Sequence, residues 1–502
     1  MDICEDPYKK LLPYQIPHVN RLLNCLKLYN RALDASDTGT GKTYSAIATC
    51  LLLNLKPFII CPKSVINSWI TVMGHFDKAP HYGIANYELI KNCRYYNTIT
   101  KERTECPYVD TYLTKNKKGE KVRKYKWKFP DDVIIIFDES HRCKNVKTQN
   151  SELLFSLSHY PHAILMLSAT ACDTKKDFKL YGYVLGLYSA LDKANTWIYS
   201  IAGSLKNPMK EIHEYLFPTY GSRMRIRDIS NQIFKGNDIR AECLEMKTAP
   251  EIQKQWELIG NAVNMLQEKQ NNAKALGMII RARQRIEMLK VPTFIKVVRI
   301  ALKKGYSVAV FMNFTDSLKK VARHFKSDCF IYGEQSLDDR NQAIKNFNED
   351  RERLIFCNIK AGGVGISLHD CNGNYPRMSV ISPTWSAQDL IQVLGRIHRA
   401  EAKTDAIQLI LFCDEKHEKV VKNAVQKKIR NIAILNDGDM QGYQIKGLYE
   451  TEESDQPRAT PFEKAFRQLT VLNIKRDRLK KELEQTEQEI KDLHHQLPRL
   501  AD

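Results

Sequence analysis

The sequence lacks several features that would point to a membrane or a secreted protein. It has no uninterrupted apolar run of about 18 residues, the length that a membrane-spanning helix requires. The stretch MDICEDPYKK at positions 1–10 has no apolar core, which argues against a secretory signal. None of the 13 cysteines forms a C-x-x-C pair, so no zinc site is indicated. Scattered cysteines of this kind are typical of reduced thiols, and we expect an intracellular protein, nuclear or cytoplasmic, without membrane association.

Acidic residues are too few to balance the basic ones. The 502 residues include 77 Lys and Arg against 58 Asp and Glu, which gives a formal net charge of +19. An excess of this size favours a polyanionic partner, and nucleic acid is the commonest one. A content of 43% hydrophobic and 27% charged residues is that of an ordinary globular protein. The length requires more than one hydrophobic core.

Short apolar runs alternate with helix-length segments in two parts of the chain. In the first part the strand candidates are 56–62, 82–88, 133–139 and 162–170. In the second part, which begins near 291, they are 306–314, 328–334, 353–359, 378–384 and 407–413. Such alternation predicts parallel sheets covered by helices. The expected fold class is therefore α/β, with two parallel-sheet domains in tandem.

The remaining segments give the expected domain limits. The stretch at about 190–290 is rich in helix formers and poor in strand patterns, so we expect a helical insertion and linker there. The polar segment 449–461 carries two prolines and is predicted to be a linker. The predicted domains are 1–235 (with an insert at 101–130), 236–290, 291–445, the linker 446–461 and a helix at 462–502.

The last segment carries a heptad pattern. Its apolar positions, spaced by four and three, are Ala465, Leu469, Leu472, Leu479, Leu483, Ile490, Leu493 and Leu497, and Arg476 and Thr486 interrupt them. The pattern fits either one amphipathic helix that packs on this chain or an intermolecular coiled coil. The second alternative would give self-association or a protein partner through 462–502.

The stretch SDTGTGKT at 36–43 precedes a helical apolar pattern. In a P-loop, glycines let backbone N–H groups face phosphates, a lysine meets the β- and γ-oxygens, and a Ser or Thr ligates Mg²⁺. The pattern G-x-x-x-x-G-K-[ST] is met except at the first glycine, where Ser36 stands. A motif this short also occurs in ordinary loops. The predicted ATP-binding residues are Asp37, Thr38, Gly39, Thr40, Gly41, Lys42 and Thr43.

The stretch VIIIFDESH at 133–141 runs from a buried strand directly into Asp138 and Glu139. The mutual repulsion of adjacent carboxylates costs free energy unless a nearby cation compensates it. The alternative is that these are ordinary charged residues at the surface end of a strand. A Mg²⁺ held by Thr43 needs a carboxylate at the tip of a neighbouring strand, and Asp138 is placed to supply it. We predict that Glu139 orients or deprotonates the attacking water.

These motifs, with SAT at 168–170 and QVLGRIHR at 392–399, resemble those of superfamily 2 helicases and translocases in order and spacing. Finer features resemble the Swi/Snf-type branch. They are LLPYQIPHVNRLL (11–23), CPKSVINSW (61–69), NIKAGGVGISLHD (358–370) and SPTWSAQDLIQVLGRIHR (382–399). The stretch 287–311, together with DESH, is similar to the annealing-helicase subgroup. The resemblance covers about residues 10–415 and not the tail.

The resemblance implies two RecA-like domains with one ATP between them. Gln15 stands where the family has its adenine-reading glutamine. Lys42 and Glu139 form the implied catalytic set together with Arg396 and Arg399, which would act as arginine fingers; their i, i+3 spacing predicts one helix face. Residues implied to couple ATP to movement are Ser168, Ala169, Thr170 and Gln392. The sequence departs from the family pattern at two places, Ala171 after SAT and RAEAK at 399–403. These departures set the chain apart from the chromatin-remodelling members. Neither position is expected to contact the phosphates of ATP, so the expected ATPase activity is unaffected.

Nucleic-acid contacts are predicted at two places. Loops that resemble the family's backbone-contacting motifs contain Lys63, Ser64, Gly362, Gly363 and Gly365. The insert CPYVDTYLTKNKKGEKVRKYKWKF at 106–129 predicts a β-hairpin, and residues 101–130 hold ten Lys or Arg against four Asp or Glu. The basic side chains proposed to touch phosphates are Lys117, Lys118, Lys121, Arg123, Lys124 and Lys126. A solvated hairpin that protects a sheet edge is the alternative.

The sequence as a whole predicts an ATP-dependent nucleic-acid translocase with ATP and Mg²⁺ as cofactors. DNA is the expected track in preference to RNA, and double-stranded DNA in preference to single strands. The first alternative is a strand-separating DNA or RNA helicase that acts in transcription or repair. The second is a non-catalytic, architectural DNA-binding protein, which is disfavoured because every expected phosphate-handling residue is present.

Overall fold

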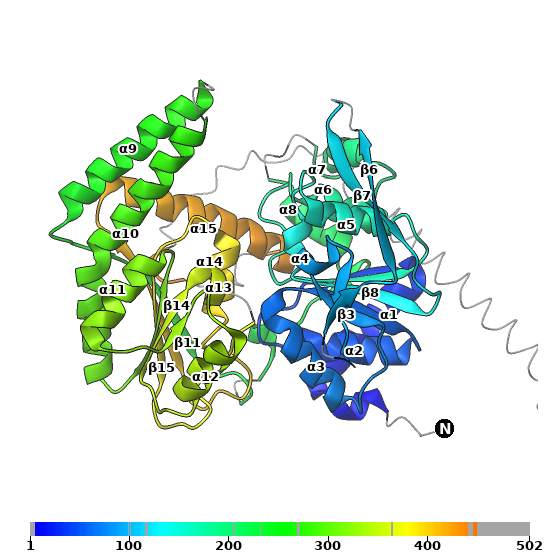
Figure 1. The fold of residues 1–502 in the computed structure, drawn as a ribbon, viewed down its shortest axis with the longest axis horizontal. Helices are drawn as coiled ribbons and strands as arrows, with labels where there is room; N and C mark the ends of the chain where they lie inside the picture. The colour runs from blue at the N-terminus through cyan, green and yellow to red at the C-terminus, as the bar shows by residue number, and fades with distance from the viewer. Residues whose placement is uncertain are drawn as a thin grey trace, which may run out of the picture.

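The computed structural model describes residues 6–98, 100, 102–115, 119–203, 205, 207–230, 232–268, 272–362, 365–439 and 445–448. The predicted helix at 462–502, and all but three residues of the predicted linker 446–461, lie outside them. Two sheets with their helices form two bodies that lie side by side (Figure 1). We call the body that contains residues 6–228 the first lobe and the body that contains residues 237–439 the second lobe.

The first lobe is built on an eight-stranded sheet with the order β10-β1-β9-β8-β2-β3-β4-β5. Its strands are β1 (Arg31–Asp34), β2 (Lys56–Cys61), β3 (Gly83–Asn86), β4 (Arg94–Tyr96), β5 (Arg103–Glu105), β8 (Val133–Asp138), β9 (Ala163–Leu167) and β10 (Gly221–Ser222). The pairs β3–β4 and β4–β5 are antiparallel, and the others are parallel.

Helices cover both faces of this sheet. They are α1 (Ile16–Tyr29), α2 (Lys42–Leu52), α3 (Ile66–His75), α4 (Tyr87–Ile90), α5 (Gln149–Leu157), α6 (Phe178–Val184), α7 (Ala194–Ala202) and α8 (Met209–Leu216). In β8 the side chains alternate between two cores, because Ile134 and Ile136 pack on one face while Ile135 and Phe137 pack on the other. Burial on both faces explains why this strand is an unbroken apolar run.

The predicted hairpin is present. Strands β6 (Val109–Lys115) and β7 (Lys121–Trp127) pair antiparallel over their full length as a separate two-stranded sheet. Tyr125 and Trp127 are buried against the first lobe, and the Trp127 indole N–H donates to Ser156 Oγ of α5 at 2.8 Å. The hairpin therefore lies on α5 and does not extend the edge of the main sheet.

The second lobe is built on a six-stranded parallel sheet with the order β11-β16-β15-β12-β14-β13. Its strands are β11 (Asn237–Leu244), β12 (Ser307–Met312), β13 (Phe330–Ile331), β14 (Leu354–Asn358), β15 (Arg377–Ile381) and β16 (Ala406–Cys413). Its helices are α9 (Ala249–Gln267), α10 (Asn272–Lys303), α11 (Thr315–Phe325), α12 (Leu337–Asn348), α13 (Ile359–Gly362), α14 (Ala387–Leu394) and α15 (Lys416–Asp437).

The expected α/β class with two parallel-sheet bodies is confirmed, and each predicted strand overlaps an observed one. The segment 190–290 differs from the prediction because it contains β11, which pairs with β16 at the sheet edge. Only Ile239 and Ala241 of this strand are buried. Half-exposed edge strands carry charged residues, so the apolar pattern that marks a central strand is weak here. The predicted limit 290/291 falls inside α10.

Helix α15 connects the two lobes. It leaves the end of β16 in the second lobe and packs against α8 of the first lobe (Figure 1). The Asn431 amide N–H donates to the carbonyl of Asp173 at 3.0 Å, and the Asn436 amide N–H donates to that of Ala169 at 2.7 Å. The second lobe is thus anchored to the first at the end of α15 as well as at the lobe interface described below.

In the described residues, no helix combines the length and the apolar character needed to cross a bilayer. The twelve cysteines in those residues are all free thiols.

Candidate functional site

The predicted phosphate loop connects β1 to α2. Gly39 and Gly41 have φ values of +89° and +86°, a region that residues with a Cβ rarely adopt. Gly41 caps the start of α2, so the free N–H groups and the positive dipole end of this helix face the loop. The Lys42 ammonium donates to the carbonyls of Ser36 at 2.9 Å and Asp37 at 3.0 Å, so it lies across the loop. The arrangement is a cradle for an anion.

A buried polar cluster supports this loop from below. His18 of α1 bonds through Nε2 to Asp34 Oδ2 at 3.0 Å and through Nδ1 to Ser222 Oγ at 2.8 Å. The other Asp34 oxygen accepts the backbone N–H of Ser36 at 2.9 Å. Burial would raise the pKa of Asp34, but the charge and the hydrogen bond of His18 outweigh it and lower this pKa. The sequence analysis missed this cluster, because its members lie far apart along the chain.

Gln15 lies against the phosphate loop. Its side chain is buried; its Nε2 donates to the Thr40 carbonyl at 3.1 Å and its Oε1 accepts the Leu12 N–H at 2.9 Å. A Cβ added to Gly41 would stand 2.3 Å from Gln15 Nε2, so a larger residue at position 41 would displace the end of the Gln15 side chain. The predicted adenine-reading glutamine is thus placed beside the nucleotide loop.

Asp138 and Glu139 lie where β8 ends. Asp138 Oδ2 accepts the indole N–H of Trp69 at 3.0 Å, and Glu139 Oε2 lies 3.2 Å from His141 Nδ1. Burial and the neighbouring Glu139 charge raise the pKa of Asp138. Burial would also raise the pKa of Glu139, but the hydrogen bond and charge of His141 outweigh it and lower this pKa. A cation beside Asp138 would therefore be favourable, because it would offset the burial and the Glu139 charge that disfavour the ionised form of this carboxylate.

The donor set fits a magnesium ion. Thr43 lies in the first turn of α2, which follows β1, and Asp138 ends β8; one strand, β9, separates β1 from β8 in the sheet. A hydroxyl and a carboxylate are oxygen donors of the kind that Mg²⁺ prefers when phosphates and water complete its shell. In the described residues, no group of three or more His, Cys, Asp or Glu side chains could hold a metal ion by itself.

The second lobe lies directly on the phosphate loop. A Cβ added to Gly395 would stand 2.0 Å from Thr38 Oγ1, and one added to Gly39 would stand 3.3 Å from Arg399 Cγ. Arg396 Nη1 and Arg399 Nη2 both donate to the carbonyl of Ile366, at 3.1 and 2.9 Å. The two predicted arginine fingers therefore converge beside the loop.

The prediction that these arginines share one helix face is wrong. Helix α14 ends at Leu394 with Gly395 as its cap, and Arg396 and Arg399 follow in non-helical chain. They meet because both guanidinium groups turn toward the same carbonyl. Burial and the charge of Arg399 lower the pKa of Arg396 to about 9, and burial lowers the pKa of Arg399 to about 10. Both side chains therefore stay cationic at neutral pH.

The predicted coupling residues lie on both sides of the lobe interface, residues 168–170 in the first lobe and Gln392 in α14 of the second. Gln392 Nε2 donates to Glu139 Oε2 at 3.1 Å, and His141 Nδ1 lies 3.2 Å from Ser168 Oγ. The carbonyls of Ala169 and Thr170 accept amide N–H groups from Asn436 and Gln388 of the second lobe. Sequence reasoning missed Gln388, which also accepts from the Lys144 ammonium at 2.8 Å.

A second interface site contains the predicted backbone-contacting loops. A Cβ added to Gly365 of the second lobe would stand 3.3 Å from the Ser64 carbonyl oxygen of the first. A cavity of about 170 Å³ opens beside them, with polar lining residues Lys63, Ser64, Asn67, Ser68, Asn86, Tyr96, Arg103, Arg340 and Asn341. Gly362 ends α13 nearby in sequence, and Gly363 lies outside the described residues.

The basic side chains of the hairpin divide into those bonded to the first lobe and those exposed to solvent. Arg123 donates to the Lys91 carbonyl and to Asn92 Oδ1 at 3.0 and 3.1 Å, and Lys124 pairs with Glu152 at 2.8 Å. These two side chains are engaged within the first lobe. Lys121 and Lys126 are exposed, and Lys117 and Lys118 lie outside the described residues.

Comparison with known families finds two matches that follow the two lobes. Residues 8–172 match the family described as type III restriction enzyme, res subunit. Residues 290–401 match the helicase conserved C-terminal domain.

Comparison with curated proteins finds relatives along most of the chain. A protein of Acanthamoeba polyphaga mimivirus, provisionally named an ATP-dependent RNA helicase, is 35% identical over 87% of this chain and 85% of its own length. The ISWI chromatin-remodeling complex ATPase ISW1 of Saccharomyces cerevisiae is 22% identical over 83% of this chain. The ATP-dependent DNA helicase DDM1 of Arabidopsis thaliana is 21% identical over 89% of it. The chain spans 40% of ISW1 and 64% of DDM1.

Two solved structures resemble the fold at low scores. A SWI2/SNF2 ATPase core of Sulfolobus solfataricus with double-stranded DNA is 18% identical, covers 85% of this chain and 93% of that chain, and has a TM-score of 0.33. Dbp5 of S. cerevisiae bound to RNA is 13% identical, covers 87% and 93%, and has a TM-score of 0.45. At these scores the assignment rests on the sequence matches. The motifs, the family matches and the mimivirus relative show that the chain belongs to the superfamily 2 helicases, on the Swi/Snf-like branch, and is a nucleic-acid-dependent ATPase.

Proposed function

We propose that the chain hydrolyses ATP between its two lobes and uses lobe closure and opening to move along double-stranded DNA. The contact of Gly395 and Arg399 with the phosphate loop is the observation that carries this proposal. Because Gly395 and Arg399 of the second lobe lie against the phosphate loop of the first, this contact supports a link between the state of the nucleotide and the distance between the lobes. Hinge closure around a bound nucleotide is a common way to convert hydrolysis into movement.

In this mechanism, residues 36–43 and the N-terminus of α2 bind the phosphates. Lys42 neutralises the β- and γ-oxygens, and Thr43 and Asp138 would hold Mg²⁺, which supplies further positive charge there. Glu139 orients the attacking water and accepts its proton, with its own orientation fixed by His141 and Gln392. Arg396 and Arg399 approach from the second lobe and stabilise the charge that develops on the transferred phosphoryl group.

Nucleic acid would pass the cavity between Ser64 and Gly365, where both lobes present polar groups and backbone. Small residues and free N–H groups suit contact with phosphates and carry no base information. DNA is favoured over RNA because ISW1 and DDM1, two of the relatives, are named for chromatin and DNA. The net charge of +19 supports a polyanion of either kind.

An RNA helicase is the second candidate. The mimivirus relative carries that name and is more similar to this chain, at 35% identity, than ISW1 or DDM1. On this candidate the same ATP site would drive strand separation of RNA in place of movement along an intact duplex.

The two candidates differ in the polymer that stimulates hydrolysis. We expect duplex DNA to raise ATP turnover more than duplex RNA or either single strand. We also expect the chain to displace the third strand of a DNA triplex without unwinding a plain DNA duplex. Greater stimulation by RNA, together with separation of an RNA duplex, would replace the proposal with the second candidate.

The proposed role of Glu139 predicts a separation of binding from hydrolysis. Glu139→Gln keeps the oxygen that faces Gln392 but cannot take a proton, so nucleic-acid-stimulated turnover should fall by about 10²-fold or more. ATP affinity should stay within about threefold of the wild type, since Asp138 and Lys42 remain. Glu88→Gln, which changes an exposed carboxylate paired with Lys91, is the matched control. A collapse of ATP affinity in Glu139→Gln would show that Glu139 belongs to the metal-binding side.

The exposed hairpin lysines predict a change in salt dependence. If Lys121 and Lys126 touch duplex phosphates, the double variant Lys121→Gln/Lys126→Gln should make the slope of log K against log[salt] shallower by about 1.8, or about 0.9 per contact. The control is Arg123→Gln/Lys124→Gln, because both side chains are engaged within the first lobe; it should leave the slope unchanged. An unchanged slope in the Lys121→Gln/Lys126→Gln variant would show that these two lysines face solvent and do not contact the nucleic acid.

A further inference from the structure

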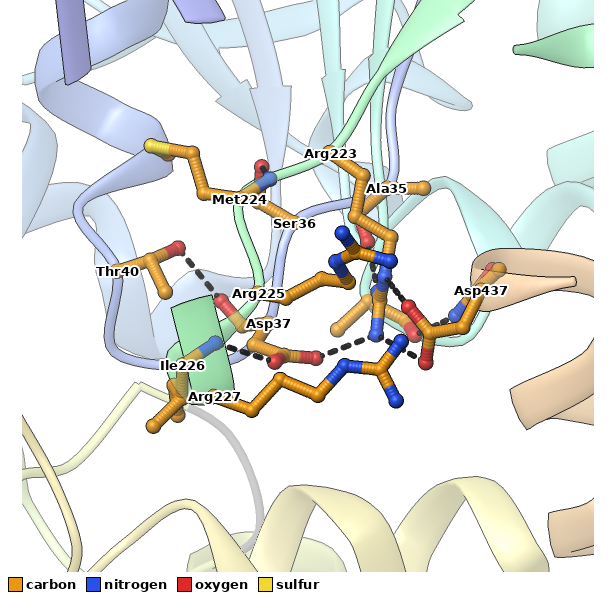
Figure 2. Close-up of polar contacts among 12 residues, drawn as sticks. Ala35, Ser36, Asp37, Thr40, Arg223, Met224, Arg225, Ile226, Arg227 and Asp437 are labelled. Atoms are coloured by element: carbon orange, nitrogen blue, oxygen red, sulfur yellow. Dashed lines mark hydrogen bonds and ion pairs between the residues drawn. The ribbon is translucent and has the colours of Figure 1, made fainter. Parts of the chain in front are cut away.

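Arg223 occupies the junction between the phosphate loop and the second lobe. It follows β10 of the first lobe, and its guanidinium reaches three partners (Figure 2). Nε and Nη2 donate to the two carboxylate oxygens of Asp437, at 2.5 and 3.1 Å. Nη2 also donates to Asp37 Oδ1 at 2.7 Å, and Nη1 donates to the Ala35 carbonyl. One side chain therefore joins two residues of the first lobe to the last residue of α15.

The ion pair between Arg223 and Asp437 is buried, so each of the two charges needs the other to compensate it. The Arg223 side chain is 5% exposed, and that of Asp437 is not exposed at all. Asp437 stands at the C-terminus of α15, where the helix dipole disfavours a negative charge. A buried carboxylate at that position is tolerated only when a cation and hydrogen bonds compensate it, and the fork of Arg223 supplies both.

The segment that carries Arg223 also holds the phosphate loop by its backbone. The N–H groups of Ala35 and Asp37 donate to the carbonyls of Ser222 and Met224, both at 3.0 Å. In return, the Met224 N–H donates to Ser36 Oγ, and the Ile226 N–H donates to the second Asp37 oxygen, both at 2.9 Å. Asp37 is thus fixed at both ends of its carboxylate, by Arg223 on one side and by Ile226 on the other (Figure 2).

Asp437 reaches this place only when α15 is docked on the first lobe. The docking contacts next to it are Asn436 with the Ala169 carbonyl and the Leu435 carbonyl with His213 Nδ1. Movement of the lobes that withdraws the end of α15 would leave Arg223 with one carboxylate in place of two. The shape of the phosphate loop and the docking of α15 therefore share one set of bonds.

We infer that Arg223 is a positioning residue for ATP binding, and that with Asp437 it links the docking of α15 to the shape of the phosphate loop. The inference rests on the proposed role of residues 36–43 in binding phosphate. Coupling between two sites acts equally in both directions. If docking of α15 stabilises the present shape of the phosphate loop, a nucleotide that binds this shape must also stabilise the docked position of α15. This connection runs beside the one made by Arg396 and Arg399 and does not use either of them.

Steady-state kinetics of the full chain with saturating nucleic acid test the inference. Arg223→Lys keeps the charge, but one ammonium cannot span both carboxylates as the arginine fork does. Asp437→Asn keeps the shape and removes the charge. Each should raise KM for ATP about tenfold, the size of one charge-assisted hydrogen bond, and leave kcat within about threefold. The matched control is Asp439→Asn, since Asp439 joins the same two segments through Arg227 at 3.0 and 3.1 Å; its KM should change less than twofold.

Hydrogen exchange gives a readout that a purely structural role would not move. In the wild type, Mg-ADP should slow amide exchange at residues 39–43 and also at 431–437. In Arg223→Lys it should slow exchange at 39–43 alone. Equal slowing of both segments in the variant, or KM values no higher than that of Asp439→Asn, would overturn the inference. A lower melting temperature with unchanged KM would overturn it as well, because it would leave only a stabilising role.

Lys42→Ala separates this inference from the proposal on which it rests. We expect this variant to lose ATP turnover. If Lys42→Ala hydrolyses ATP normally, the phosphate-loop assignment itself is wrong, and the inference falls with it. If Lys42→Ala is inactive while Arg223→Lys and Asp437→Asn have wild-type KM, only the inference is wrong.

Discussion

Gly395 and Arg399 of the second lobe lie on Thr38 and Gly39 of the first, and the proposed chemistry depends on this contact. The first lobe supplies an anion cradle and two carboxylates, and the second supplies two buried cations. The first lobe has its own cation in Lys42, but the proposed hydrolysis also requires the positive charge of the two arginines, which only the second lobe supplies. The absence of a side chain at Gly395 is what permits the contact, because a Cβ there would overlap Thr38.

The ends of parallel strands explain how one contact can reach so many functional groups. β1 and β8 end at the same edge of the first sheet, which brings the phosphate loop and the carboxylates together. The interface is then held at several points, by Gln392 on Glu139, by Gln388 on Thr170 and by the end of α15 on Ala169 and Arg223. In the proposed mechanism, such a distributed interface would couple the nucleotide site to the position of a whole lobe.

The sequence predicted the parts of the fold that depend on local pattern. Buried strands such as β8 were visible as apolar runs, and the phosphate loop was visible as a motif. The edge strand β11 was missed because half of it faces solvent, and Arg396 and Arg399 were placed on a helix that ends before them. His18, Arg223 and Asp437 could not be found, because each acquires its role from a partner at least 16 residues away that only the fold brings near. The predicted helix at 462–502 lies outside the described residues and stays a prediction.

The most direct test of the two-lobe site is turnover by Arg399→Ala, measured together with ATP affinity. This change removes a cation that the second lobe brings to the phosphate loop and leaves the cradle of the first lobe intact. The account predicts that kcat falls by about 10³-fold, as for other arginine fingers, with little change in ATP affinity. A normal kcat with a raised KM would contradict it, because Arg399 would then contribute only to binding in the ground state.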